Sequence, residues 1–165
     1  MKIETIAIVI IAAIAFAVKA NGVEVSDRLL NAIYQVETSD GKFLKGDYSK
    51  KTKEYRAIGP FQLWRIYVDD VNNILKNKGI SKRYSYADRW SYQKSREMVI
   101  IYLKHYGRQF EIDSERYITK YRPELKGKIK VMCNDMVLAM IHNGGPKGYQ
   151  KKATLEYWNK IKVNL

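Results

Sequence analysis

Apolar residues recur at helical spacing in several segments of the chain, and capping or turn residues bound these segments. In the first segment, either Ser26 or Asp27 can cap a helix, and Gly41 marks the loop beyond its end. One face of this helix is predicted to carry Leu30, Ile33, Tyr34 and Glu37, which lie three, four and seven residues apart. The apolar face of the helix therefore ends in the carboxyl group of Glu37.

The rest of the pattern predicts further helices and a small irregular region. Pro60 suits a first helical turn, so a helix is expected from Gly59-Pro60 to about Gly79. Further helices are expected after Ser91 and closed by Gly107, over 112–121, over 131–142, and around Leu155, Tyr157, Trp158 and Ile161. In the polar loop 38–57, segments 43–44 and 55–57 are expected to pair as short strands. The fold class is therefore predicted to be α+β, predominantly helical, with a hairpin or irregular region after the first helix.

The position of Glu37 points to chemistry. A carboxyl group at the end of an apolar stripe is partly dehydrated, which raises its pKa. Glycoside hydrolases use a carboxyl group that stays protonated near neutral pH as their general acid. The alternative is a Glu at the edge of the stripe that turns to solvent.

The chain has 165 residues, enough for one domain, and its first twenty are set apart by composition. Lys2 precedes an apolar run of 14 residues, 5–18, and Val18-Lys19-Ala20 offers small residues at a cleavage site. Such a run spans about 21 Å as a helix, less than the roughly 30 Å of a bilayer core. We predict a signal peptide over 1–20 and a domain over 21–165, exported to the periplasm or outside the cell. An uncleaved membrane anchor is the alternative.

The chain is strongly basic, with 30 Lys and Arg against 17 Asp and Glu, a net charge of +13. For an exported protein this charge favours an anionic cell-wall or membrane surface as partner, and no nucleic acid is expected. Cys133 is the one cysteine, so the chain cannot form an intramolecular disulfide, and a buried, inert thiol is expected. The spacing of the two histidines shows no metal site, and no cofactor is expected. We expect a monomer.

Three segments occur in an order that resembles the lysozyme-like superfamily. Val36-Glu37-Thr38-Ser39 is similar to the Glu-Ser motif of soluble lytic transglycosylases and lysozymes, and 57–63 (AIGPFQL) is similar to their Gly-x-x-Gln turn. The segment 141–148 (IHNGGPKG), followed by 154–158 (TLEYW), most resembles invertebrate-type lysozymes, or destabilases. Those proteins are rich in disulfides, so this chain is more similar to a disulfide-free bacterial or phage relative. The isopeptidase activity of some destabilases is not carried over.

The resemblance implies a lysozyme-like catalytic domain that cuts peptidoglycan glycan strands between N-acetylmuramic acid and N-acetylglucosamine. Glu37 would protonate the glycosidic oxygen, and Asp47 is the nearest counterpart of the second carboxylate. Asp47 would act as nucleophile, electrostatic stabiliser or base, or would be a solvated loop residue. A separation of about 5 Å suits retention, and about 6.5–9.5 Å suits inversion. The residues expected to bind substrate are Ser39, Gly59, Gln62, His142, Asn143, Gly144 and Tyr157.

Two other functions stay open at this point. A lytic transglycosylase would use Glu37 alone and leave 1,6-anhydro ends. A non-catalytic basic protein that binds cell wall, membrane or nucleic acid would bind with a steep salt dependence and would not need Glu37.

Overall fold

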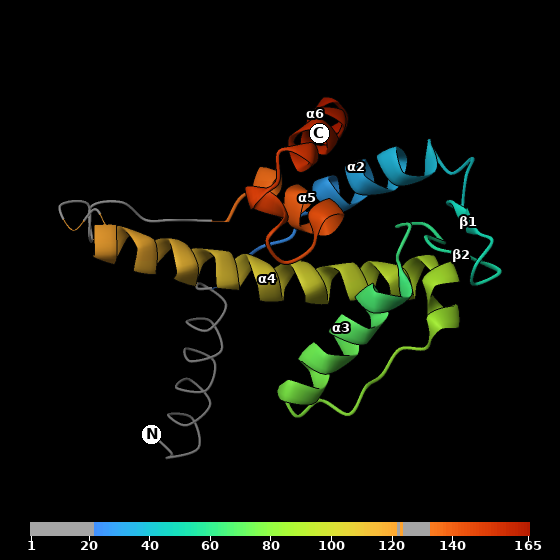
Figure 1. Ribbon diagram of the computed structural model, residues 1–165, viewed down its shortest axis with the longest axis horizontal. Coiled ribbons are helices and arrows are strands. Elements are labelled where there is room, and N and C mark those ends of the chain that lie inside the picture. The colour runs from blue at the N-terminus through green and yellow to red at the C-terminus, as the bar shows by residue number, and fades with distance from the viewer. Residues whose placement is uncertain (1–21, 122, 124–132) are drawn as a thin grey trace, which may run out of the picture.

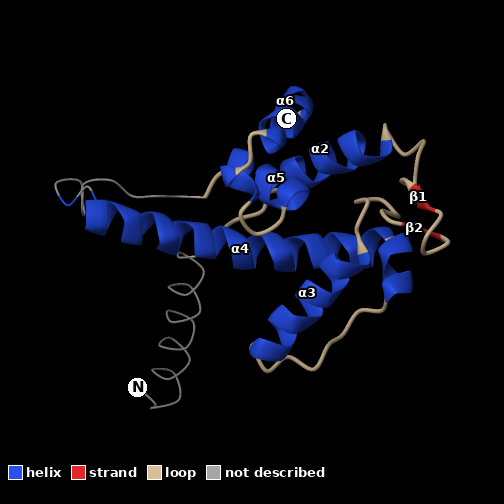
Figure 2. Ribbon diagram, viewed as in Figure 1, coloured by secondary structure: helices blue, strands red, loops and turns tan. Residues whose placement is uncertain are grey.

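The computed structural model describes residues 22–121, 123 and 133–165. In chain order its elements are α2 (Asp27–Thr38), β1 (Tyr48–Ser49), β2 (Glu54–Tyr55), α3 (Arg65–Asn77), η1 (Tyr86–Trp90), α4 (Tyr92–Tyr121), α5 (Asp135–Gly144), η3 (Gly148–Gln150), α6 (Ala153–Ile161) and η4 (Lys162–Asn164). Helices dominate, and one antiparallel pair of two-residue strands forms the sheet (Figures 1 and 2). This confirms the predicted α+β class. The signal peptide expected over 1–20 lies outside the described residues and stays a prediction.

The long helix α4 runs along the molecule, and the other helices are arranged around it (Figure 1). Helices α2, α5 and α6 pack against one another on one side of α4, and α3 packs on another side. The hairpin lies at the end where α4 begins. Fully buried side chains that form the core include Leu29, Leu30, Ile33, Phe61, Val68, Val71, Met98, Leu103, Leu138, Ile141 and Ile161. Within the described residues, no helix is both long enough and apolar enough to span a bilayer.

Helix α2 forms as the sequence pattern predicts. The Ser26 hydroxyl caps its N-terminus by accepting a hydrogen bond from the Leu29 amide at 3.1 Å. At the other end Ser39 adopts a left-handed conformation with φ 49°, and the Thr38 hydroxyl accepts from the Gly41 amide at 2.7 Å. These contacts end the helix one residue after Glu37, so Glu37 lies in its last turn.

The hairpin has a different register from the predicted one. Tyr48 pairs with Tyr55, whereas segments 43–44 and 55–57 were expected to pair. The chain beyond the hairpin then closes a tight turn, because Ile58 and Leu63 exchange backbone hydrogen bonds at 3.3 and 3.1 Å. The helix expected at Pro60 therefore begins only at Arg65. Proline favours tight turns as well as first helical turns, and here the turn is formed.

Gly107 lies inside helix α4, and the predicted break there is wrong. The helix continues to Tyr121 and includes the segment 112–121, which was expected to form a separate helix. A Cβ at Gly107 would lie 2.9 Å from Val23 Cγ1, 3.0 Å from Leu138 Cδ2 and 3.2 Å from Cys133 Sγ. The glycine thus lets the N-terminal segment and α5 approach α4 closely.

The two C-terminal helices match the prediction in most respects. Asn134 caps α5 by accepting from the Val137 amide at 3.1 Å, and the expected start at 131–132 lies outside the described residues. Helix α5 ends at Gly144, within two residues of the predicted end at His142, and Gly145 follows it with a positive φ of 84°. In α6, Tyr157 and Ile161 are buried.

Candidate active site

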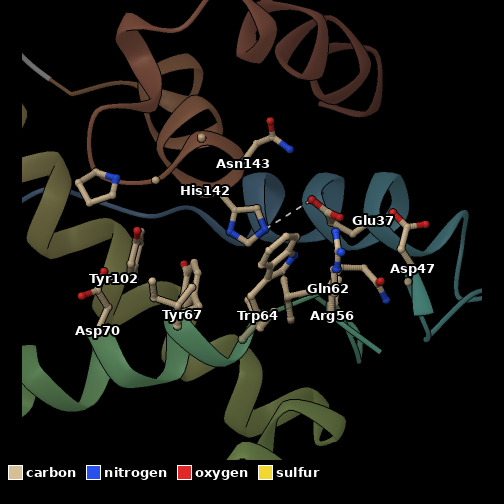
Figure 3. Close-up of a pocket in the computed structure, with 18 of the residues that line it drawn as sticks. Glu37, Asp47, Arg56, Gln62, Trp64, Tyr67, Asp70, Tyr102, His142 and Asn143 are labelled. Carbon is tan, nitrogen blue, oxygen red and sulfur yellow. Dashed lines mark ion pairs between the residues drawn. The ribbon is translucent and has the colours of Figure 1, made fainter. Parts of the chain in front are cut away.

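A cavity of about 670 Å³ lies between α2, the hairpin, the turn after it, α3, α4 and the C-terminal end of α5 (Figure 3). Its lining residues are Glu37, Gly46, Asp47, Arg56, Ala57, Phe61, Gln62, Leu63, Trp64, Ile66, Tyr67, Asp70, Tyr102, His142, Asn143, Gly144, Gly145, Pro146 and Lys151. Segments that are far apart in the chain therefore meet at one site, which we refer to as the cleft.

Glu37 projects from the last turn of α2 into the cleft, and its side chain is only 18% exposed. Tyr157 of α6 donates a hydrogen bond to Glu37 Oε1 at 2.8 Å. Burial raises the pKa of Glu37 from 4.5 to about 7, although the Tyr157 hydrogen bond and the charge of Lys160 act in the opposite direction. A large fraction of Glu37 is therefore protonated at neutral pH, as a general acid requires.

His142 lies beside Glu37 at the end of α5, with its Nε2 3.6 Å from Glu37 Oε1. Burial lowers the pKa of His142 to about 4, against an opposing effect of the Phe61 backbone. Between pH values of about 4 and 7 both groups are thus predominantly neutral, so their contact is not an ion pair. Among the described residues, the buried Nδ1 of His142 has no hydrogen-bond partner.

Asp47 is brought to the same cleft by the hairpin, where it is solvent-exposed. Its backbone carbonyl accepts a hydrogen bond from the Arg56 amide at 3.0 Å, which joins the two sides of the hairpin. Figure 3 shows Glu37, Asp47, Arg56 and Gln62 toward one end of the cleft and Asp70 and Tyr102 toward the other. The hairpin thus supplies a second carboxyl group at the end of the cleft that holds Glu37.

Of the residues expected to bind substrate, four line the cleft: Gln62, His142, Asn143 and Gly144. Ser39, Gly59 and Tyr157 do not line it. Ser39 caps α2, and Tyr157 is buried behind Glu37. Gly59 was expected to let a sugar approach the backbone, but a Cβ there would lie 1.8 Å from the Arg89 carbonyl oxygen. Its role is to let the turn pack on η1.

The sequence pattern missed several residues that line the cleft: Arg56, Trp64, Ile66, Tyr67, Asp70 and Tyr102. Trp64 lies four residues before Val68 and seven before Val71, a spacing that predicts one buried helical stripe, but it is 51% exposed, and Ile66 is 70% exposed. Because α3 begins at Arg65, Trp64 occupies its N-cap position and points away from the core-facing stripe. The sequence does carry a signal for an exposed apolar side chain at this point. Residues two apart lie on nearly opposite sides of a helix, so Trp64 and Ile66 cannot both lie on the stripe that carries Val68 and Val71.

Cys133 is half-buried, and burial, with the charges of Glu111 and Asp135, raises its pKa to about 12. The thiol therefore stays protonated and is a poor nucleophile, as expected. In the described part of the chain, no three His, Cys, Asp or Glu side chains are grouped as a metal site would require.

Comparison with known proteins places this geometry in a structural context. No protein-family model matches the chain. It is 42% identical to invertebrate-type lysozyme 6 of Caenorhabditis elegans over 48 residues, which is 29% of this chain and 33% of the relative. It is 43% identical to a lysozyme of Ostrea edulis over 47 residues, 28% of this chain and 34% of the relative. The chain thus spans about a third of the length of the curated relatives it matches.

Solved structures extend the similarity to most of the chain. A chain from the crystal structure of Aeromonas hydrophila PliI in complex with Meretrix lusoria lysozyme matches with a TM-score of 0.54 and 21% identity, covering 86% of this chain and 92% of that one. Tapes japonica lysozyme matches with a TM-score of 0.50 and 22% identity, covering 83% and 88%. This protein therefore has a lysozyme-like fold.

Proposed function

We propose that this protein is a muramidase that cuts the β-1,4 bond between N-acetylmuramic acid and N-acetylglucosamine in peptidoglycan. The observation that carries the proposal is Glu37, a buried carboxyl group with a pKa of about 7 inside the cleft of a lysozyme-like fold. The local identity to invertebrate-type lysozymes supports the same activity.

In this proposal Glu37 gives its proton to the glycosidic oxygen as the bond breaks. The Tyr157 hydroxyl occupies Oε1, so the proton is carried by Oε2, for which the described residues supply no hydrogen-bond partner. Asp47 is the second carboxyl group, and it stabilises the positive charge that develops on the sugar or activates the incoming water. The leaving sugar takes the proton of Glu37, and the hydroxyl of the incoming water bonds to the anomeric carbon. The remaining proton of that water returns to Glu37, or goes to Asp47 and from there to solvent while Glu37 takes a proton from solvent.

The other cleft residues suit a saccharide chain. Trp64 and Ile66 expose apolar surface at the cleft on which sugar rings can lie. Gln62 and Asn143 supply side-chain amides, which both donate to and accept from hydroxyl and N-acetyl groups. Arg56 provides a guanidinium group whose N–H groups can donate to the carbonyl oxygens of the N-acetyl and lactyl substituents.

The test removes the acidic proton of Glu37 without changing the shape of the side chain. Glu37→Gln is expected to abolish clearing of a peptidoglycan suspension while it preserves the circular dichroism spectrum. The matched control is Glu156→Gln, which removes the same charge from an exposed position on α6 and should clear the suspension at the wild-type rate. Clearing by Glu37→Gln at the wild-type rate would remove Glu37 from the mechanism and reject the proposal.

Mass spectrometry of the released fragments identifies the reaction. Hydrolysis leaves reducing ends, whereas a lytic transglycosylase leaves 1,6-anhydro ends that are lighter by one water. We expect reducing ends, because the hairpin places Asp47 in the same cleft as Glu37. Anhydro ends from wild type, with full activity of Asp47→Asn, would assign the reaction to Glu37 alone.

A further inference from the structure

Another depression, of about 370 Å³, is formed by the same segments of the chain that supply part of the cleft wall. It is lined by Lys53, Glu54, Tyr55, Ile58, Arg65, Tyr86, Ala87, Arg89 and Trp90, and we call it the hairpin groove. Chain neighbours of these residues, Arg56 and Trp64 among them, line the cleft instead. The groove and the cleft therefore share a wall but no lining residue.

The floor of the hairpin groove contains a buried cation, Arg89, which is only 4% exposed. Its guanidinium group donates to backbone carbonyls, from Nε to Tyr86 at 2.9 Å and from Nη1 to Leu63 at 2.9 Å and Arg56 at 3.4 Å. Among the described residues, no carboxylate forms an ion pair with Arg89 and none accepts a hydrogen bond from Nη2. A buried charge without a directly paired counter-charge favours binding of an anion.

The walls of the hairpin groove add both charge and aromatic surface. Arg65 forms an ion pair with Glu54 at 2.6 Å and lies over the Tyr86 ring at 4.5 Å from its centroid. With Lys53 and Arg89 the groove holds three cationic side chains against one carboxylate. Trp90 is 45% exposed, and Tyr55 and Tyr86 are also exposed. Exposed aromatic rings beside cations suit a ligand that has both sugar rings and negative charge.

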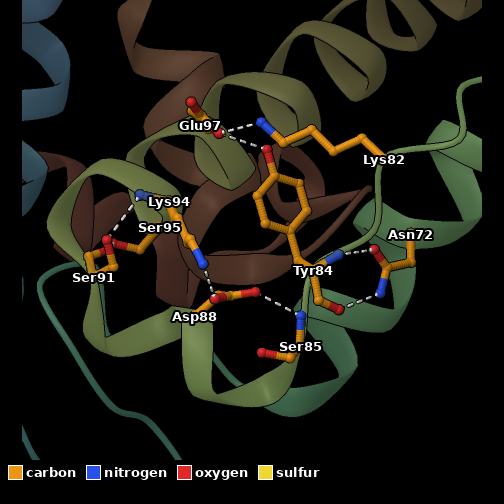
Figure 4. A network of polar contacts seen from close by, with 9 residues as sticks. All are labelled: Asn72, Lys82, Tyr84, Ser85, Asp88, Ser91, Lys94, Ser95 and Glu97. Atoms are coloured by element: carbon orange, nitrogen blue, oxygen red, sulfur yellow. Dashed lines mark hydrogen bonds and ion pairs between the residues drawn. The ribbon is translucent and has the colours of Figure 1, made fainter.

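The segment that carries Arg89 and Trp90 is held in place by the polar network of Figure 4. Asp88 accepts from the Ser85 amide at 2.7 Å and from Lys94 Nζ at 2.6 Å. Tyr84 exchanges two hydrogen bonds of 2.8 Å with the Asn72 side chain. The network ties η1 to α3 and α4, so the groove is formed before any ligand arrives.

We propose that the hairpin groove is a second binding site, for an anionic saccharide polymer. An anionic group of the polymer binds at Arg89 and Arg65, and an adjoining ring lies against Trp90. The bound strand is held outside the cleft, on the other side of the hairpin that carries Asp47. The proposal does not depend on the reaction assigned to Glu37.

Isothermal titration calorimetry of the whole protein tests the site with three probes: a phosphomannan (a polysaccharide that carries phosphate groups), polygalacturonate and neutral chitohexaose. Trp90→Ala is expected to weaken binding of the anionic polymers roughly tenfold, since it removes an aromatic contact surface. Glu54→Gln is expected to strengthen it about fivefold, since it removes the one carboxylate in the groove. Chitohexaose binding should not change in either variant. Whether the phosphate or the uronate polymer responds identifies the anion that the groove accepts.

The matched control is again Glu156→Gln, which changes the net charge as Glu54→Gln does but lies on α6. It should change the affinity less than twofold. Equal effects of Glu54→Gln and Glu156→Gln, or unchanged binding by Trp90→Ala, would show attraction by the overall charge alone and overturn the proposal. Glu54→Gln keeps the side-chain shape, so this arm decides the matter if Trp90→Ala proves unstable. Cleavage of a neutral oligosaccharide by both variants reports on the cleft separately.

Discussion

The raised pKa of Glu37 predicts that the carboxyl group destabilises the fold at alkaline pH. Its pKa is about 7 in the folded protein, against a reference value of 4.5. The folded state therefore holds this proton more tightly than the unfolded state. Stability from the protonated form is fully present below about pH 4.5 and is lost as the pH rises through about 7.

The size of the effect follows from the difference between the two pKa values. A difference of about 2.5 pKa units corresponds to about 3 kcal/mol when the group is fully ionised. Between about pH 5 and about pH 8 the change is about 2–3 kcal/mol. Burial lowers the pKa of His142 from 6.5 to about 4, so His142 contributes stability that rises with pH over the same interval. This contribution is common to wild type and Glu37→Gln, so the difference between the two proteins isolates Glu37.

Glu37→Gln removes the ionisation but keeps the size of the side chain and an oxygen that accepts from Tyr157. We therefore expect the difference in unfolding free energy, variant minus wild type, to increase by about 2–3 kcal/mol between about pH 5 and about pH 8. In thermal unfolding, the Tm of the variant minus that of wild type should increase by roughly 5–10 °C over the same pH interval. Urea unfolding of both proteins at both pH values measures it, with Glu156→Gln as the exposed control. A constant difference between wild type and Glu37→Gln would refute the burial of Glu37 as the cause of its pKa.

Three further outcomes are expected. Tyr157→Phe removes a hydrogen bond that favours the carboxylate form of Glu37, so the pKa of Glu37 should rise. In a pH–rate profile, the pH at which lytic activity falls on the alkaline side should therefore move upward. A downward shift would contradict this geometry. Gly107→Ala should destabilise the fold by about 1–3 kcal/mol in urea unfolding, because its Cβ would lie 2.9–3.2 Å from packed side chains; a stabilised variant would contradict the close packing. We predict that export removes the signal peptide, so intact-mass measurement of the protein recovered outside the cytoplasm should give Asn21 as its first residue. Retention of residues 1–20 would reject this cleavage.

The parts of the fold that depend on local patterns could be predicted from sequence. The cap at Ser26, the apolar face of α2 and the end of α5 depend on neighbouring residues, and the structure has all three. The placement of Glu37 at the end of a buried stripe was likewise visible, because helical periodicity fixes which side chains share a face.

The parts that depend on contacts between distant segments could not be predicted. Gly107 resembles a helix end in sequence, and only the approach of Val23 and Leu138 shows why the helix continues through it. Gly59 resembles a sugar-binding turn, yet it packs against Arg89, thirty residues later in the chain. Tyr157 was assigned to the substrate, because no sequence pattern reveals that its hydroxyl reaches Glu37.

The hydrogen bond between Tyr157 and Glu37 joins residues separated by 120 positions. During synthesis α2 is made well before α6, so a nascent chain carries Glu37 long before the helix that covers it. Until α6 docks, this carboxyl group is hydrated and gives up its proton as any free glutamate does. The pKa of Glu37 is thus raised only after α6 has been made and has docked, which delays any chemistry of the cleft until that helix is in place.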